Sequence, residues 1–314
     1  MSNPASIFRP FDLRDESAYR RWREWKLDRY PRSADDLVVR IGDPTQPEPS
    51  EHAEILARCC KANAAIYEAN GGNIADRDLI RRFGYQFGLK QLDRNLRADE
   101  DSITSLRVLH GAGSKRYIPY TNRPLNWHTD GYYNPITEQV RGIVMHCVSA
   151  AAAGGDNLFL DQEIAYILLR DENPEYIRAL MQPDVMTIPP NLENGRLIRA
   201  EQTGPVFSVE KRSGGLHMRY TARTRSIAWK DDRNTRLAVG FLAELLASDS
   251  AYIFRHRLQA GQGIICNNIL HKREAFTDDP GNGQERVLYR ARYYDRIRGT
   301  EIGSTDYGVM ECFG

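Results

Sequence analysis

The pattern of apolar and polar positions changes near residue 100. Before that point apolar residues recur mainly at helical spacing, whereas from about Ser102 onward short β-rich segments alternate with turn residues. We therefore expect a mainly helical region over residues 1–100, packed against a β-rich core over residues 101–314. The two parts are expected to form one integrated domain.

Two helices are expected in the first region. Ser50 is a good N-cap for a helix that runs to about Ala69 and ends at a Gly-Gly pair. A second helix is expected over residues 77–83, with Gly84 ending it.

The second region contains many short strands with two helical insertions. The expected strands cover residues 104–110, 116–120, 140–150, 157–160, 205–209, 216–220, 252–258, 263–268 and 286–294. The insertions cover residues 161–182 and 234–247. This pattern predicts a mainly β fold with helical additions, built on a jelly-roll (double-stranded β-helix) core.

Composition narrows the class of protein. The formal net charge is +1, which gives no electrostatic reason to expect a nucleic-acid partner. No apolar run has the length of a signal peptide or a membrane span, so we expect a cytoplasmic protein without a membrane partner. The five cysteines include no Cys-x-x-Cys pair, which argues against a zinc ribbon.

A His-x-Asp motif suggests a metal site. Residues 126–130 read Asn-Trp-His-Thr-Asp. Side chains two positions apart on a strand point to the same side, so His128 and Asp130 can reach one metal ion together. His271 follows the expected strand 263–268. Two histidines and a carboxylate are the ligand set of non-haem iron(II) oxygenases, although a hydrogen-bonded strand histidine is the ordinary alternative for either residue alone.

A row of arginines strengthens this interpretation. As a strand, residues 286–292 place Arg286, Arg290 and Arg292 on one face. Buried guanidinium groups are costly without anions, whereas an edge strand would expose the row to solvent. The pattern leaves both alternatives open. A buried row of arginines would suit a dicarboxylate such as 2-oxoglutarate, because guanidinium binds carboxylate with two parallel hydrogen bonds.

Together these residues resemble the taurine dioxygenase-like (clavaminate synthase-like) family of iron(II)- and 2-oxoglutarate-dependent oxygenases. The matching pieces occur in the family's order and cover about residues 102–294. They are residues 126–130, Gly-Gly-Asp-Asn-Leu at 154–158, Leu270-His271 and Arg286-x-x-x-Arg290.

The resemblance implies a role for each matching residue. The expected iron ligands, which are also the catalytic residues, are His128, Asp130 and His271. Arg286 corresponds to the arginine that binds the distal carboxylate of 2-oxoglutarate. Asn157 stands where the family often has a threonine that holds this cosubstrate, which is a departure. Arg290 corresponds to an arginine that contacts either a substrate anion or the C1 carboxylate of 2-oxoglutarate.

The resemblance also implies a reaction. We expect Fe(II), 2-oxoglutarate and O2 to be used to oxidise, and most simply to hydroxylate, a C–H bond of a small anionic or zwitterionic molecule, with release of succinate and carbon dioxide. Asp130 argues against halogenation, because related halogenases lack this carboxylate. The candidate substrate contacts are Asn126, Gly131, Tyr132, Tyr133, Arg290 and Arg292.

Two other functions remain compatible with the sequence. A zinc-dependent hydrolase could use the same three ligands, although it would not need Arg286 or Asn157. A non-catalytic jelly-roll protein could sense 2-oxoglutarate or iron. Family members are often dimers or tetramers, and the sequence does not fix the number of subunits.

Overall fold

The computed structural model describes residues 9–93, 102–109, 118–211, 213–223 and 227–302. It is mainly β, with six α-helices among these residues. This confirms the predicted class of a β-rich fold with helical additions. None of the described helices combines the length and the apolar composition that crossing a lipid bilayer would require.

The larger sheet has six strands and carries the row of arginines. Its order is β1 (Val38–Ile41), β2 (Ala64–Ala69), β16 (Gln262–Cys266), β5 (Gly142–Ser149), β19 (Val287–Tyr293) and β3 (Thr104–Leu106). β1 and β2 pair in parallel, and the other neighbours pair antiparallel.

A second sheet of four strands carries both histidines of the predicted metal site. Its order is β15 (Phe254–His256), β7 (Asn157–Leu160), β17 (Leu270–Arg273) and β4 (Leu125–His128). The smaller pairings involve β6 (Ala153–Gly154), β8 (Met186–Ile188), β9 (Asn191–Glu193), β10 (Arg196–Arg199), β11 (Gln202–Gly204), β12 (Phe207–Val209), β13 (Leu216–Met218), β14 (Ala228–Trp229) and β18 (Phe276–Thr277).

Alternation along the strands buries both faces of the six-stranded sheet. On β5, Ile143, Met145 and Cys147 join a large apolar cluster that also contains Leu160 of β7 and Leu270 of β17, so this face packs toward the four-stranded sheet. Val144 points to the opposite face and joins a second cluster. Because both faces are covered, apolar residues occur at consecutive positions of β5, such as Ile143, Val144 and Met145.

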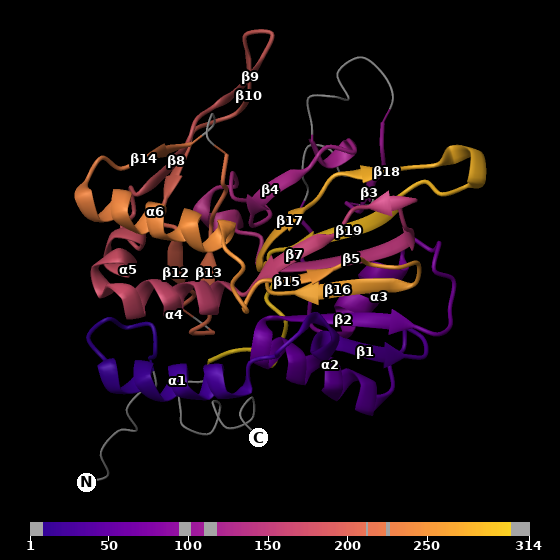
Figure 1. Cartoon of the computed structure of the whole chain (residues 1–314), viewed down its shortest axis with the longest axis horizontal. Helices are drawn as coiled ribbons and strands as arrows, with labels where there is room; N and C mark the ends of the chain where they lie inside the picture. The colour runs from indigo at the N-terminus through magenta and orange to yellow at the C-terminus, as the bar shows by residue number, and fades with distance from the viewer. Residues whose placement is uncertain (1–8, 94–101, 110–117, 212, 224–226, 303–314) are drawn as a thin grey trace.

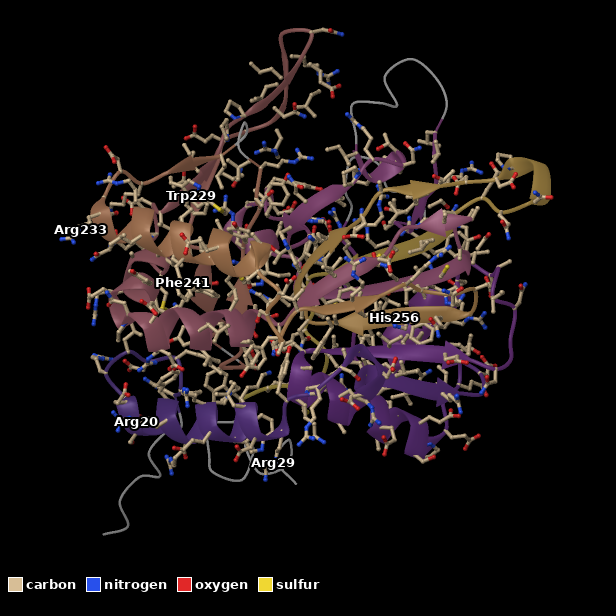
Figure 2. All side chains as sticks on the ribbon, viewed as in Figure 1. Arg20, Arg29, Trp229, Arg233, Phe241 and His256 are labelled. Atoms are coloured by element: carbon tan, nitrogen blue, oxygen red, sulfur yellow. The ribbon has the colours of Figure 1, made fainter. Side chains whose placement is uncertain are left out.

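The helices cover the two sheets from outside. α2 (Pro49–Ala62) and α3 (Leu79–Gln86) supply Ile55 and Phe83 to the second cluster. α4 (Gln162–Glu172), α5 (Pro174–Leu180) and α6 (Arg233–Ala247) group at the left of Figure 1. Phe241 of α6 lies 6.2 Å from Tyr176 of α5, between ring centroids, and Figure 2 shows it on the side of α6 nearest α5.

The N-terminal region differs from the prediction because it also contributes strands. The helix predicted to run to Ala69 ends at Ala62, since Asn63 adopts a left-handed conformation (φ 55°). The following residues form β2, which pairs with β16. Alanine favours a helix in isolation, and the pairing with a distant strand overrides that preference. Gly84 lies within α3 instead of ending it. The division into regions at residue 100 stays a prediction.

Most strands predicted in the second region are present, with shorter bounds. The exception is residues 116–120. Ile118–Tyr120 form a short 3-10 helix, and residues 116 and 117 lie outside the described part of the chain. The helical insertions are confirmed as α4, α5 and α6.

α1 (Glu16–Arg29) is attached to the core by a buried ion cluster. Lys26 is fully buried, and its Nζ lies 2.6 Å from Asp161 Oδ2 and 2.6 Å from Glu163 Oε2. Burial alone lowers the pKa of Lys26, but the two carboxylates outweigh it and raise that pKa above its usual value. Asp161 also caps α4 by accepting the Glu163 backbone N–H. Lys26 therefore joins α1 to the start of α4. Arg20 and Arg29 lie on the outer side of α1 (Figure 2).

Replacing Lys26 tests this attachment. We expect Lys26→Met to lower the free energy of unfolding by about 3–5 kcal/mol, because two buried carboxylates lose their cation. The matched control is Arg20→Ala, which removes an exposed ion pair with Glu16 on the same helix and should cost less than about 0.5 kcal/mol. Urea denaturation measures both. Equal losses in the two variants would contradict a stabilising role for the buried cluster.

Candidate metal centre and adjoining pocket

The predicted ligands converge at one edge of the four-stranded sheet. His271 on β17 lies directly opposite His128 at the end of β4, and their ring centroids are 4.3 Å apart. Asp130 follows two residues after His128. Ligand atoms of the three side chains all lie within 4.8 Å of one another, and all three residues are buried. The structure thus brings together the three residues that the sequence singled out.

Two details of this arrangement differ from the prediction. β4 ends at His128, so Asp130 lies in the turn beyond it rather than on the same strand. Asn268 holds that turn: its side chain accepts a hydrogen bond from the Asp130 N–H (2.8 Å) and donates one to the Asp130 carbonyl (2.9 Å). His271 follows β16 as predicted, but it lies on a further strand, β17, that the sequence did not predict.

Both histidines are arranged to offer the same ring nitrogen. His128 Nδ1 lies 2.8 Å from the Asn126 carbonyl, and His271 Nδ1 lies 2.9 Å from the Ile269 carbonyl. A carbonyl only accepts, so each Nδ1 carries the proton and each Nε2 keeps its lone pair. Burial lowers the pKa of both rings, that of His128 to about 3. Both rings are therefore neutral near pH 7 and able to bind a metal.

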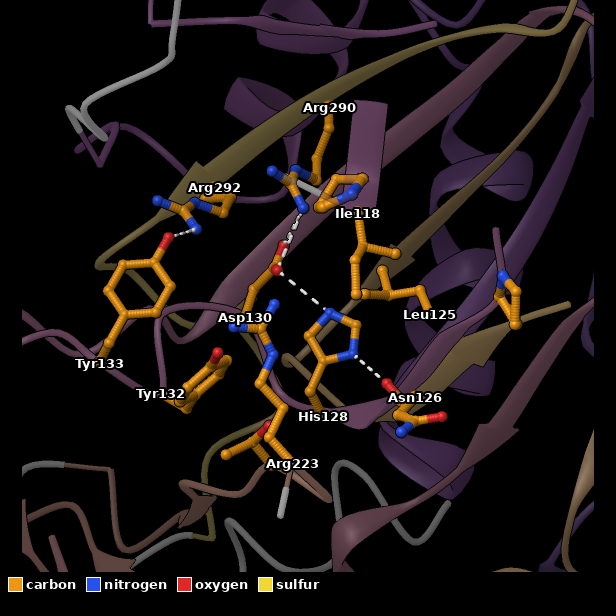
Figure 3. Close-up of a pocket in the computed structure, with 13 residues that line it drawn as sticks. Ile118, Leu125, Asn126, His128, Asp130, Tyr132, Tyr133, Arg223, Arg290 and Arg292 are labelled. Atoms are coloured by element: carbon orange, nitrogen blue, oxygen red, sulfur yellow. Dashed lines mark hydrogen bonds and ion pairs between the residues drawn. The ribbon is translucent and has the colours of Figure 1, made fainter. Parts of the chain in front are cut away.

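Asp130 completes the set as an ionised carboxylate. Burial raises its pKa, but the charges of Arg290 and Arg292 outweigh that effect and hold the pKa well below its usual range. Arg290 Nη1 lies 3.1 Å from Oδ1 and 3.0 Å from Oδ2 (Figure 3). Oδ2 is buried and accepts no hydrogen bond of good geometry from the described residues. Two neutral imidazoles and a carboxylate with an unsatisfied oxygen fit a non-haem iron(II) ion.

Arg286 is a buried cation without a side-chain partner. It immediately precedes β19 and is 6% exposed. Its backbone N–H donates to Asp278, but its guanidinium forms no hydrogen bond or ion pair within the described part of the chain. Instead it lies 5.1 Å from the ring centroid of Phe276. Burial lowers the pKa of Arg286 to about 10. Such a group is a ready site for an anion.

Asn157 follows a segment whose backbone passes close to this cation. It is buried at the start of β7, two residues after Gly155. A methyl group at Gly155 would come within 3.6 Å of Arg286 Nε, so the backbone here passes close to the guanidinium. Asn157 also faces Arg273 across the strand pair.

A cavity of about 120 Å³ adjoins the metal ligands. Of the predicted substrate contacts, its lining includes Asn126, Tyr132, Tyr133, Arg290 and Arg292. Gly131 is not in the lining. It has a left-handed φ of 66°, and a Cβ there would lie 2.5 Å from Val140 Cγ2, so the turn itself requires glycine.

The lining also contains residues that the sequence did not reveal, among them Leu125, Thr221 and Arg223. Thr221 reaches the site because it forms an isolated bridge with His128. That contact joins segments far apart in the chain, and no motif marks it. His146 and His217, by contrast, lie on β5 and β13 and take no part in the metal-ligand group.

Comparisons with known proteins agree with this geometry. The family model described as taurine catabolism dioxygenase TauD, TfdA family matches residues 72–292. Two relatives are named uridine-5'-phosphate dioxygenase. The protein from Amycolatopsis sp is 30% identical over 178 residues, covering 55% of this chain and 62% of its own length. The protein from Streptomyces sp is 31% identical over 211 residues, covering 62% of this chain and 70% of its own.

Solved structures share the fold at low sequence identity. A taurine dioxygenase from Burkholderia xenovorans superposes with a TM-score of 0.54 at 18% identity, covering 84% of this chain and 88% of that one. Asparagine oxygenase in complex with Fe(II), 2S,3S-3-hydroxyasparagine and succinate gives a TM-score of 0.55 at 14% identity, covering 89% and 92%. AAD-2 in complex with Mn(II) and N-oxalylglycine gives a TM-score of 0.58 at 16% identity, covering 86% of this chain and 99% of that one.

The family match extends over more than half of the chain and includes all three candidate ligands and Arg286. It confirms the resemblance predicted from the motifs and an enzyme of the dioxygenase class, and dependence on iron(II) and 2-oxoglutarate follows from the family. The chain belongs to the taurine catabolism dioxygenase TauD, TfdA family.

Proposed function

We propose that this protein is a dioxygenase that uses O2 and 2-oxoglutarate to hydroxylate a C–H bond of a small anionic molecule. In the overall reaction, R–H, 2-oxoglutarate and O2 give R–OH, succinate and carbon dioxide. The observation that carries the proposal is the convergence of His128, Asp130 and His271 in a protein that also buries the unpaired cation Arg286, four residues before Arg290. A zinc hydrolase would need the three metal ligands but would have no use for a buried, unpaired arginine.

We infer that the two facing sheets form a double-stranded β-helix. Their antiparallel pairing, their shared apolar cluster and the structural neighbours support this inference. In such a core, the metal ligands of the four-stranded sheet and the arginines of β19 point into one interior.

The three ligand side chains would hold Fe(II), which supplies O2 activation when bound together with 2-oxoglutarate. The Arg286 guanidinium would pair with the distal carboxylate of the cosubstrate, and the Asn157 amide would donate a further hydrogen bond. Burial of these residues keeps water away from the reacting atoms.

Arg290 has a role that the sequence left undecided. Its Nη1 contacts both oxygens of Asp130, so we propose that it orients this carboxylate toward the metal. Its Nε is buried and has no hydrogen-bond partner among the described residues. That atom remains available to an anionic group of the substrate or cosubstrate.

The substrate class follows from the relatives and the pocket. Both relatives with dioxygenase names carry uridine 5'-phosphate in those names. The cavity here is lined by Arg223, Arg290 and Arg292, with Tyr132 and Tyr133 beside them. Cationic groups next to aromatic rings suit a phosphorylated molecule that contains a planar ring. We therefore propose a nucleoside 5'-phosphate as the substrate class.

The metal assignment can be tested by spectroscopy without turnover. Anaerobic addition of Fe(II) and 2-oxoglutarate should produce a weak visible charge-transfer band, and His128→Ala should abolish it because one of three ligands is lost. The matched control is His52→Ala on α2, whose ring stacks on Phe87 away from the ligands. A band that survives in His128→Ala would contradict the assignment. Tight zinc binding with no band would favour the hydrolase.

The cosubstrate assignment has a separate test. We expect Arg286→Gln to weaken 2-oxoglutarate binding about 10- to 100-fold, because a charge-assisted pair contributes about 1.5–3 kcal/mol. Titration of the charge-transfer band gives the dissociation constant. The control Arg255→Gln removes an exposed arginine paired with Glu274 and should leave this constant unchanged. Equal constants for wild type and Arg286→Gln would exclude Arg286 from the cosubstrate site.

Replacing Asn157 probes the departure from the family pattern. Asn157→Ala should weaken 2-oxoglutarate binding about 2- to 10-fold, as expected for one neutral hydrogen bond. Asn157→Thr restores a donor and should recover most of the affinity. The same titration measures both variants, and a threonine variant as weak as the alanine variant would argue against a hydrogen bond from this position.

A further inference from the structure

Arg223 is the cation of the pocket lining that has no charged partner in the described part of the chain. The other two lining arginines are already engaged. Arg290 is held by Asp130, and Arg292 pairs with Asp93 and donates to the Tyr133 hydroxyl. Arg223 forms no ion pair or hydrogen bond with described residues. Figure 3 shows its side chain entering the pocket between Tyr132 and His128.

A second arginine approaches the same aromatic pair from a different element. Arg199, at the end of β10, has its guanidinium carbon 5.9 Å from the ring centroid of Tyr133. It donates to the Ala200 carbonyl (2.8 Å) and the Pro189 carbonyl (2.6 Å). Neither acceptor is charged, and no described carboxylate pairs with it. Arg199 is not part of the pocket lining itself, but it brings a second uncompensated positive charge to the ring of Tyr133, which is.

Arg219 connects the hairpin that carries Arg199 with the segment that carries Tyr132. This buried guanidinium donates to the Tyr132 carbonyl (2.7 Å), the Met186 carbonyl (3.0 Å) and the Gln202 carbonyl (2.8 Å). Met186 lies on β8 and Gln202 on β11, which pair with each other and flank the β9–β10 hairpin. The hairpin that carries Arg199 is thereby joined to the segment that carries Tyr132. Arg219 itself is 5% exposed, so this link belongs to the folded core.

The Tyr133 hydroxyl adds a neutral donor. It accepts a hydrogen bond from Arg292 Nη1 (3.0 Å), so its own proton is available to another acceptor. The rings of Tyr132 and Tyr133 meet edge to face, with centroids 5.1 Å apart. Two guanidinium groups and one phenol proton thus converge beside an aromatic wall.

We propose that Arg223 and Arg199, together with the Tyr133 hydroxyl, form a binding subsite for a phosphate monoester on the substrate. This proposal rests on the proposed function and identifies residues that select the substrate. A carboxylate is satisfied by one guanidinium, whereas a phosphate monoester carries close to two charges and three acceptor oxygens. Two uncompensated arginines and a phenol match the phosphate in both charge and number of donors.

Binding of uridine 5'-phosphate and uridine to the anaerobic Fe(II)–2-oxoglutarate protein tests the subsite. Perturbation of the charge-transfer band and calorimetry report the dissociation constants. We expect uridine 5'-phosphate to bind at least about tenfold more tightly than uridine, because only the former engages the arginines. Arg223→Gln should weaken the phosphate about 10- to 100-fold and Arg199→Gln about 3- to 10-fold, with uridine unaffected.

The controls separate this subsite from the rest of the pocket. Arg223→Lys keeps the charge and should recover part of the affinity, while Arg178→Gln, at an exposed arginine on α5, should change nothing. Affinity for 2-oxoglutarate should be the same in all four variants. Inorganic phosphate should compete with uridine 5'-phosphate in wild type and lose that ability in Arg223→Gln.

Several results would overturn the proposal. One is equal affinity for uridine 5'-phosphate and uridine in wild type, and another is unchanged affinity for uridine 5'-phosphate in Arg223→Gln. A third is binding of the sulfonate taurine as tight as that of uridine 5'-phosphate. The last is no detectable binding of either uridine 5'-phosphate or inorganic phosphate. Each of these can be seen while the charge-transfer band is intact. A missing band would instead count against the proposed function itself, so the two failures are distinguishable.

Discussion

The antiparallel pairing of β17 with β4 is the interaction on which the rest of the site depends. Its register places His271 directly opposite His128, and the carbonyls of Asn126 and Ile269 fix both rings with Nε2 unprotonated. Asn268, three residues before His271, adopts a left-handed conformation (φ 51°) and holds the Asp130 turn through two hydrogen bonds. Three ligands from two separate segments are thus positioned by strand pairing and by hydrogen bonds to the backbone before any metal arrives. A shift of one residue would turn a histidine away from the site.

Charge balance inside the protein explains where ligands are expected. Asp130 is compensated by Arg290, and Arg292 by Asp93, so these buried charges form pairs. Arg286 is buried and has no such partner among the described residues, whereas Arg223 is an exposed residue of the pocket lining that also has no described charged partner. An unpaired buried cation lowers stability, which makes its persistence informative about an anion. In our account Arg286 binds the cosubstrate carboxylate, and Arg223 and Arg199 bind the substrate phosphate.

Sequence reasoning reached the ligands because their pattern is local or belongs to a known family. His128 and Asp130 are two residues apart, and the arginines of β19 alternate with period two. The predictions from sequence were wrong where pairing with a distant segment decides the secondary structure. Residues 64–69 carry alanines that favour a helix, and only pairing with β16 makes them β2. Arg199 approaches Tyr133 because Arg219 links β8, β11 and the Tyr132 segment, and no spacing in the sequence predicts that link.

The central claim is that this preformed site holds iron and 2-oxoglutarate in one defined way. A crystal structure of the protein grown anaerobically with Fe(II) and 2-oxoglutarate tests it most directly. Our account predicts metal bonds to Nε2 of His128, Nε2 of His271 and a carboxylate oxygen of Asp130, with the distal carboxylate of 2-oxoglutarate on the Arg286 guanidinium. Iron bound elsewhere, coordination through Nδ1, or a cosubstrate whose distal carboxylate avoids Arg286 would contradict it.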